Sequence, residues 1–505
     1  QYDTPENLSE STLQHHGLHA LHVLSYLGDQ DLINVNAPDV VYFSVPALGL
    51  FVYQVTWVKW ISAGLIILFL LALLAINRSS VGLYGALIGT GISILGASLS
   101  FGFALLLLNW LPRFHPEAGS LQGSLYHSEG WYVIALTGAA FTIVTGLHAL
   151  ARKWLSVQQL ALGAVVLPFV GAIWLGYTAP LAAMNLEWPV AAALLSVLWI
   201  TVMGEQTTEM LGWFLAVLFS VPVLSFFVPV AELLWIAMTF EFAPVLAILI
   251  AIGLYLCLPA LDSVLRLNSW WAPAGGIIVV GAALGFGILN SQTTAERPAP
   301  STLVYAYEHG TPEALWATDP VIDTMDLPAR EWAVERTGSA FGLMRDLSIF
   351  GYDFGEVPAA VAPAMDTPEP AIIIETDTTI GDIRRVIIGV RSQIGSERLR
   401  FQYDPTEDTR LISINGTVID NPEELTWADH WGTPAPMVYL ELEIPAGQPI
   451  SFDIVEHLLR PEELLGPGVF SRPDYLAPDI TRESDRAMLL YRFQESQETI
   501  EATSQ

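Results

Sequence analysis

Long apolar runs dominate the middle of this chain. Between residues 56 and 290 they are separated by short polar breaks, and each is about 20 residues long, the length at which an α-helix crosses the hydrocarbon core of a bilayer. The pattern predicts about eight membrane spans, near residues 56–77, 83–111, 131–150, 160–180, 187–203, 210–228, 241–261 and 274–290. Residues 228–240, which Pro229 interrupts, are expected to form a short re-entrant or interfacial piece.

The residues ahead of the first span have a mixed pattern. A helix is expected around Ser11–Leu27, followed by a polar connector at Gly28–Pro38. Val40–Tyr53 is apolar but too short to span a membrane, so it is expected to be a strand or an interfacial segment. Residues 1–54 are therefore taken as one part of the chain and residues 55–291 as the transmembrane part.

The period of the pattern changes after residue 291. Short runs alternate between apolar and polar positions and end at Gly, Asn or Pro, which is typical of β-strands. Strands are expected at residues 302–307, 314–317, 371–375, 385–390, 398–403, 411–414, 438–444 and 450–454, with a Pro-rich loop at 357–370. The predicted fold class is a polytopic α-helical membrane bundle followed by an acidic, β-rich, sandwich-like extracytoplasmic domain at residues 292–505.

Positive residues in the short loops predict the orientation. Arg78, the pair Arg152 and Lys153, and Arg266 fall in alternate loops, which the excess of Lys and Arg on the cytoplasmic side assigns to the cytoplasm. Arg113 is the exception. An even number of spans then returns the chain to its starting side, so both soluble parts are expected to be extracytoplasmic.

Composition and charge narrow the partners. Of 505 residues, 52% are hydrophobic, and the mean hydropathy is +0.47, so the lipid bilayer is the expected principal partner. The formal net charge of −30 comes mainly from the flanking parts. That charge argues against nucleic acid and anionic lipid as partners, since both need clusters of Lys and Arg. The single cysteine, Cys257, excludes a disulfide within the chain.

A histidine cluster is the first candidate for chemistry. In the predicted N-terminal helix, His15 and His19 are four residues apart and His19 and His22 three apart, both spacings at which side chains on one helix face can hold a divalent metal. His15 and His19 are therefore candidate metal ligands. The alternative is an ordinary solvated or packed helix face, favoured because Gly17 weakens the helix and no Glu stands in the zinc-protease pattern.

Polar residues of the membrane part lie near the predicted span ends rather than at mid-depth, where a charge indicates a transport pathway. They are Asn109, Glu205, Glu209, Glu232, Glu241 and Asp262. Two glycine pairs, Gly85 with Gly89 and Gly281 with Gly285, have the spacing that lets helices approach closely. Packing within the bundle is the expected use of these pairs, and a homo-oligomer formed through them is the alternative.

The first residues, which include no initiator Met or targeting segment, read like the interior of a folded domain, so a longer polypeptide is expected. Tyr2-Asp3-Thr4-Pro5-Glu6-Asn7-Leu8, followed by Leu13-Gln14-His15 and a helix, resembles the end of the catalytic domain in membrane-anchored co-catalytic zinc exopeptidases, the aminopeptidase Y-like metallopeptidases (peptidase family twenty-eight). Further segments are similar to that family's linker and C-terminal tail: Asp39–Phe43, Leu48–Tyr53, Arg297–Ala306 and Glu313–Trp316.

The resemblance implies zinc-dependent peptide hydrolysis, with the catalytic residues outside this chain. Members of the family use two zinc ions to activate water for attack on a peptide bond. Their last zinc-binding His belongs to a His-Thr-x-x-Asp pattern whose Asp matches Asp3, so the resemblance places zinc and the catalytic ligands upstream of Gln1 and none in this chain. Asp3 would then orient that His, or alternatively cap the following turn.

The resemblance thus implies the membrane anchor and C-terminal domain of a zinc-dependent exopeptidase, inactive by itself. The implied partners are an upstream peptidase domain, in the same or a separate chain, and a peptide substrate. A bacterial inner membrane is the expected location, with the ER or vacuolar membrane as the alternative. The competing function is a transporter or a non-catalytic membrane scaffold; a transporter requires a polar cavity at mid-membrane lined by broken helices.

Overall fold

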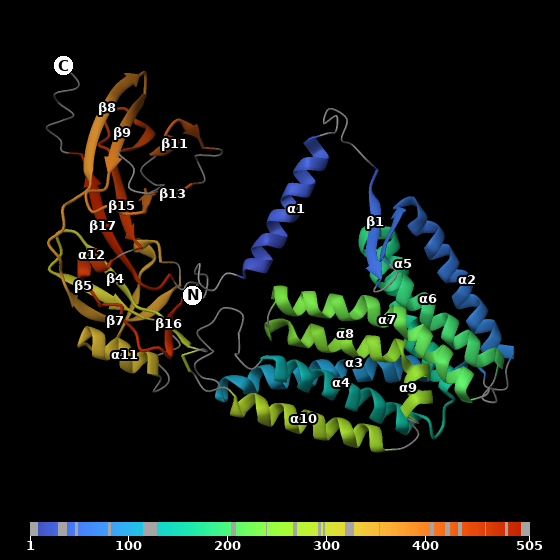
Figure 1. The fold of residues 1–505 in the computed structure, drawn as a ribbon. Helices are drawn as coiled ribbons and strands as arrows, with labels where there is room; N and C mark the ends of the chain where they lie inside the picture. The colour runs from blue at the N-terminus through green and yellow to red at the C-terminus, as the bar shows by residue number, and fades with distance from the viewer. Residues whose placement is uncertain are drawn as a thin grey trace. The chain divides into compact units, whose positions relative to one another are not determined.

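The computed structural model describes most of the chain (Figure 1). The described residues are 9–28, 38–45, 49–78, 82–114, 129–203, 209–238, 240–265, 270–290, 294–295, 298–318, 328–352, 354–403, 409–419, 425–432, 437–459, 461–479 and 483–495. Their contacts divide them into two compact units, one up to residue 290 and the other from residue 294 onward.

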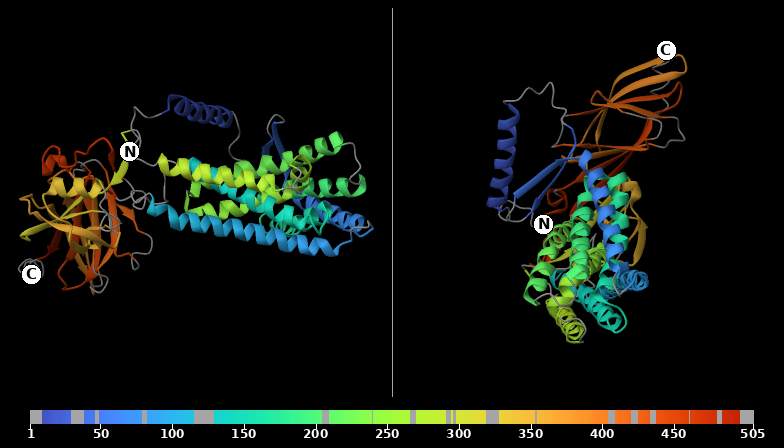
Figure 2. Two further views of the ribbon diagram at one scale, coloured as in Figure 1. Left: turned by 90° about the horizontal axis from the view of Figure 1, so that it is seen from below. Right: turned by 90° about the vertical axis from the view of Figure 1, so that its right-hand side faces the viewer.

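The first unit is helical. Seven of its helices are long and apolar enough to cross a membrane: α2 (Thr56–Arg78), α3 (Tyr84–Trp110), α4 (Glu129–Ala151), α5 (Val157–Thr178), α6 (Pro180–Met203), α7 (Glu209–Met238) and α10 (Trp271–Leu289). Helix α1 (Glu10–Gly28) precedes them and buries none of its residues. Both views of Figure 2 show the helices of the bundle lying side by side.

The predicted span at residues 241–261 differs from the others because it is broken. A 3₁₀ turn at Phe240–Phe242 leads into α8 (Ala243–Leu256), and α9 (Leu258–Leu265) follows after Cys257. Pro259 has no N–H to continue the hydrogen bonding of α8. With 14 residues, α8 is only about 21 Å long, short of the roughly 30 Å hydrocarbon core.

The broken helix nevertheless runs the length of its neighbour. At the start of α4, the ring of Tyr132 lies 5.9 Å from that of Phe240, which precedes α8. At the other end of α4, His148 and Arg152 contact Asp262 of α9. Together α8 and α9 therefore traverse the same height as α4, and α8 lies in the centre, in contact with α3, α4, α5 and α7.

The prediction of a separate re-entrant piece at residues 228–240 is wrong. Helix α7 continues through Pro222 and Pro229 to Met238. Proline is tolerated inside an apolar helix of this kind because neighbouring helices and local adjustments satisfy the backbone groups that it frees.

Glycine spacing determines how closely α3 packs on α5. A Cβ added to Gly89 would lie 2.8 Å from the carbonyl oxygen of Gln159, closer than side chains approach, so the bare backbone of α3 meets α5 directly. Gly85 likewise contacts Gln159. The second predicted pair, Gly281 and Gly285, has open space around it, with nothing within 4 Å.

A β-hairpin covers one end of the bundle. Its strands, β1 (Val40–Val45) and β2 (Gly49–Gln54), pair antiparallel, so the segment expected as a strand or interfacial piece forms two strands. The ring of Phe43 lies 4.9 Å from that of Phe226 in α7 and 6.2 Å from that of Trp188 in α6. These aromatic contacts hold the hairpin on the helices.

The second unit is β-rich, as predicted, and contains two large sheets. The eight-stranded sheet has the order β13 (Trp427–Trp431), β10 (Arg398–Gln402), β15 (Ser451–Leu458), β17 (Arg486–Gln494), β4 (Val304–Glu308), β5 (Glu313–Ala317), β7 (Glu356–Pro363) and β6 (Leu343–Asp346). The five-stranded sheet has the order β12 (Thr417–Val418), β11 (Arg410–Ile414), β14 (Val438–Pro445), β9 (Ile383–Arg391) and β8 (Ala371–Ile380).

The five-stranded sheet packs on part of the larger one. Ile388 of β9 and Leu440 of β14 share a buried cluster with Phe401 of β10 and Ile454 of β15, so this half is a sandwich in which alternate residues face the core. On the other half, α11 (Pro328–Thr337) contributes Trp332 to a cluster with strands β4, β5 and β17. This unit also contains two short strands, β3 (Ala299–Ser301) and β16 (Leu476–Pro478), helix α12 (Glu462–Leu465) and a 3₁₀ turn at Ser348–Phe350.

The predicted strands are all present, but the predicted loop at 357–370 is wrong in its first half. Residues Glu356–Pro363 form β7, which pairs with both β5 and β6. Pro and Ala depress strand propensity, and here the pairing on both sides overrides it. Strand β17 and helix α11 were not predicted from the sequence.

The close packing of α3 on α5 gives a first testable prediction. Gly89→Ala should lower the free energy of unfolding by about 1–3 kcal/mol, because its methyl group forces the two helices apart. Gly281→Ala is the matched control; with open space around it, the higher helix propensity of Ala should leave stability equal or higher. Thermal unfolding of the intact protein in detergent measures both variants, and equal midpoints would contradict this packing.

Candidate functional site

The two candidate metal ligands lie on α1. The rings of His15 and His19 are 4.2 Å apart between centroids, and both side chains are exposed. Nowhere among the described residues do three or more His, Cys, Asp or Glu side chains come together as a metal-binding group. Metal binding by His15 and His19 stays a prediction. Asp3 lies outside the described residues.

Of the polar residues noted near span ends, Asp262 makes the strongest contacts. Its Oδ1 atom lies 2.7 Å from Nε2 of His148 and accepts a hydrogen bond from Nε of Arg152 at 3.1 Å. His148 is 1% exposed. Sequence reasoning missed His148 and Arg152 as partners, although their spacing of four residues at the end of an apolar run places both on one face. The contact fastens α9 to α4.

The other polar residues noted near the predicted span ends are either exposed or outside the described residues. Glu232 and Glu241 are exposed. Asn109 is also exposed, and its side chain donates to the carbonyl oxygen of Leu105 within its own helix at 2.8 Å. Glu205 lies outside the described residues, and so does the side chain of Glu209.

A buried carboxyl that the sequence analysis overlooked joins three helices. Glu187 of α6 is fully buried, and Oγ of Ser62 in α2 donates to its Oε1 atom at 2.7 Å. Gly176 of α5 leaves space for this hydrogen bond, because a Cβ at that position would lie 2.5 Å from Oγ of Ser62. A carboxyl inside an apolar bundle is costly unless it is hydrogen-bonded, and this contact holds α2, α5 and α6 together.

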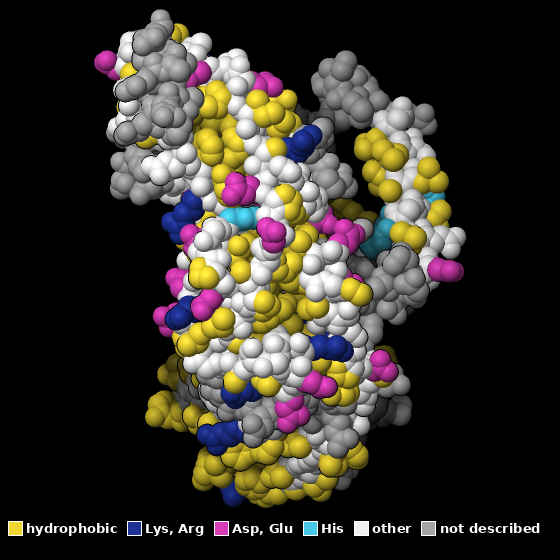
Figure 3. Space-filling view, turned by 90° about the vertical axis from the view of Figure 1, so that its left-hand side faces the viewer, with side chains coloured by type: hydrophobic (Ala, Val, Ile, Leu, Met, Phe, Trp, Pro, Cys, Tyr) yellow, Lys and Arg dark blue, Asp and Glu magenta, His cyan; other side chains and the backbone are white. Residues whose placement is uncertain are grey.

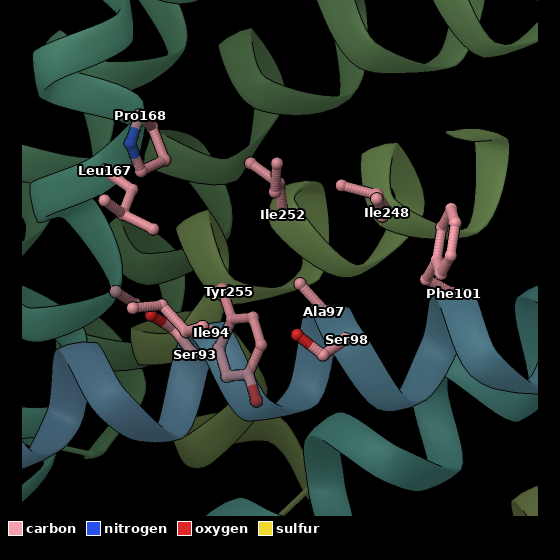
Figure 4. A pocket seen from close by; sticks show the side chains of 11 residues that line it. Ser93, Ile94, Ala97, Ser98, Phe101, Leu167, Pro168, Ile248, Ile252 and Tyr255 are labelled. Carbon is pink, nitrogen blue, oxygen red and sulfur yellow. The ribbon is translucent and has the colours of Figure 1, made fainter. Parts of the chain in front are cut away.

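Two hollows open in the helical unit, and both are largely apolar. The smaller, of about 360 Å³, lies between α3, α5 and α8. Figure 4 shows Tyr255 and Ser93 on its wall among Ile94, Leu167 and Ile248. Two of the hydroxyl groups on the wall are already used, because Tyr255 donates to the carbonyl oxygen of Ile92 and Ser93 to that of Thr90. This hollow offers little to a polar solute.

The larger hollow, of about 720 Å³, lies between α4, α7, α8 and α9. Its described lining is mostly aliphatic and aromatic, with polar atoms from Glu232, Thr137, Ser220 and Cys257. Water does not stably fill a groove of this composition. Along the described residues, this hollow is therefore not the polar cavity that a transporter requires.

The β-rich unit carries its own buried charges. Asp429 of β13 bridges Arg398 and Arg400 of β10, at 2.6 Å to Nη2 of Arg398 and 2.9 Å to Nε of Arg400. Trp431 covers Arg398 and Trp427 covers Arg400, with the cations 4.7 and 4.3 Å from the ring centroids. Acidic and basic side chains are also scattered among one another on the face that Figure 3 shows.

Two adjacent residues of β15 are buried on opposite faces of the sheet. Burial raises the pKa of Glu456 to about 7, although Ser396 donates to its Oε1 atom at 3.3 Å. Burial, reinforced by Arg398, Arg486 and Arg400, lowers the pKa of His457 to about 3. Burial therefore leaves His457 uncharged at neutral pH and keeps a proton on Glu456 well above the pH at which a solvent-exposed Glu loses it.

Comparisons with protein-family models, with curated proteins and with solved structures found no match to this chain. Its function is therefore inferred from its own residues and from the resemblance that Tyr2–Leu8 carries.

The raised pKa of Glu456 predicts a pH dependence. The folded state keeps a proton that the unfolded state releases above pH 4.5, so stability falls as the pH rises from about 4.5 to about 7. Glu456→Gln removes this loss and should stabilise the protein at pH 8, at most on the order of 3 kcal/mol, with little effect at pH 4.5. Exposed Glu375→Gln is the control. Thermal midpoints of the intact protein across this range that show no pH-dependent gain would contradict the assignment.

Proposed function

We propose that this chain is the membrane anchor and C-terminal domain of a zinc-dependent exopeptidase. The observation that carries the proposal is the segment Tyr2–Leu8 with Leu13-Gln14-His15 after it, which resembles the end of the catalytic domain in that family. In this proposal zinc and its ligands belong to a peptidase domain that precedes Gln1, and peptides with a free N-terminus are the substrates.

The packing of the helical unit favours an anchor over a transporter. Polar side chains of the bundle bind one another across helices, as Ser62 does with buried Glu187 and half-buried Arg152 with Asp262. Both hollows are mostly apolar along the described residues. A solute pathway needs exchangeable polar groups around a wet cavity, whereas a bundle that only holds a domain at the membrane needs stable contacts between helices.

The proposed topology places both soluble parts on the extracytoplasmic side. Seven continuous helices alone would leave them on opposite sides, so the crossing by α8 and α9 is an essential part of the proposal. It is supported by the contacts of Phe240 with Tyr132 and of Asp262 with His148, at opposite ends of α4. The proposed location is a bacterial inner membrane.

Cysteine labelling of intact cells tests the topology. In a Cys257→Ser background, Ser11→Cys in α1 and Val418→Cys in the β-rich unit should both react with a membrane-impermeant maleimide, since both positions are exposed. Arg78→Cys, at the cytoplasmic end of α2, should react only after the membrane is opened. Labelling of just one of the first two positions would mean an odd number of crossings.

Substitution of Asp3 tests the peptidase function in the native polypeptide. Asp3→Asn should lower zinc content or kcat/KM for peptide hydrolysis by about 10–100-fold, because a carboxylate beside a metal-bound His orients it. Glu6→Gln, three residues away in the same segment, is the matched control and should retain both. Native protein without measurable hydrolysis would contradict the proposal, and equal behaviour of the two variants would contradict the orienting role of Asp3.

A further inference from the structure

The larger hollow is a groove that follows one face of α7. Its α7 lining comes at intervals of three or four residues, which is one face of a helix, and includes Val217, Val221, Leu224, Val228, Glu232 and Trp235. From Val217 to Trp235 this face extends about 27 Å, close to the roughly 30 Å hydrocarbon thickness of a bilayer.

The floor of the groove is the broken helix. The buried residues of this floor include Leu246, Gly253 and Cys257. Gly253 leaves space between α8 and α7, because a Cβ at this position would lie only 3.2 Å from the ring of Phe227. On the α7 wall, large apolar side chains are left uncovered: Val221 is 47% and Leu224 53% exposed. The bundle thus leaves an apolar channel open to its surroundings.

The ends of the groove differ chemically. Toward the end where α7 meets the 3₁₀ turn, the lining includes the carboxylate of Glu232 and the indole of Trp235, whose ring lies 5.5 Å from that of Phe240. Elsewhere the lining is mostly aliphatic. Trp favours the boundary between hydrocarbon and headgroups, and an exposed carboxylate attracts a cation there.

We propose that this groove binds the acyl chain of a phospholipid whose headgroup carries an ammonium group. The acyl chain covers the apolar floor that α7 leaves open, and the ammonium group lies beside Glu232 and Trp235, where a carboxylate and an aromatic face both attract a cation. The volume of about 720 Å³ is within the usual range for ligand sites, about 300–1,000 Å³.

This inference rests on the membrane part of the proposed function, not on its peptidase part. It requires that α4 and α7 cross a bilayer, because only then does the groove face lipid. Bound lipid would cover the apolar floor that the broken helix forms. A bundle that binds lipid but belongs to no peptidase would leave the inference standing.

Native mass spectrometry of the intact protein, purified in mild detergent and supplied with phosphatidylethanolamine or phosphatidylglycerol, tests the groove. Wild type should retain phosphatidylethanolamine in preference. Leu224→Trp, which fills the groove, should reduce retention by at least about tenfold, since losing the burial of two methylene groups already costs that factor. Leu218→Trp, at an equally exposed position of α7 outside the lining, is the matched control.

A second variant separates the headgroup from the acyl chain. Glu232→Gln should abolish the preference for phosphatidylethanolamine over phosphatidylglycerol while leaving total lipid retention within about twofold, because the groove itself is unchanged. If Leu224→Trp fails to fold, as its thermal midpoint would reveal, this variant still tests the site. Equal retention by the two Trp variants, an unchanged preference in Glu232→Gln, or a change of oligomeric state in Leu224→Trp would overturn the proposal; the last would identify a second copy as the occupant.

Discussion

In the proposed membrane setting, the helical unit depends on one constraint: inside hydrocarbon, every backbone polar group needs a partner within the protein. The interruption at Cys257 meets it, because the N–H of Cys257 still donates to the carbonyl oxygen of Gly253 and the N–H of Leu261 to that of Cys257. The break is placed at the centre of the bundle, where α8 packs mainly on α3, α4, α5 and α7. The broken helix α8–α9 is therefore surrounded by other helices. At its far end, Asp262 is held by contacts with His148 and Arg152.

Hydropathy predicted where the helices lie but not which of them are continuous. Both segments are apolar runs that contain proline. The helix breaks near Pro259, whereas α7 continues through Pro229. Composition does not distinguish the two cases, because the neighbouring helices decide whether a helix continues past a proline. The β-rich unit shows the same limit. Strands with an alternating pattern were predicted correctly, but β17 was missed. It lies at the centre of the larger sheet with both faces buried, so its segment Met488-Leu489-Leu490 does not alternate between apolar and polar residues.

The candidate sites were harder to anticipate than the fold. His15 and His19 attracted attention through their spacing, yet among the described residues they have no further ligands beside them. Glu187 was overlooked because its partner, Ser62, is far away in sequence and hydroxyl groups are common in apolar helices. The groove could not be predicted from the sequence, because it depends on how the helices pack. The residues that line it along α7 have helical periodicity, but residues that face a core have the same periodicity.

In the proposed function, the apolar bundle and the β-rich domain serve as an anchor, and a preceding peptidase domain supplies the chemistry. The most direct test is zinc content, intact mass and hydrolysis of peptides with a free N-terminus, all measured on the polypeptide purified from its native membrane. The account predicts a peptidase-sized segment, in the same or an associated chain, with about two zinc ions and hydrolysis that a chelator removes and zinc restores. A native polypeptide that begins at Gln1, binds no zinc and hydrolyses no peptide would contradict it.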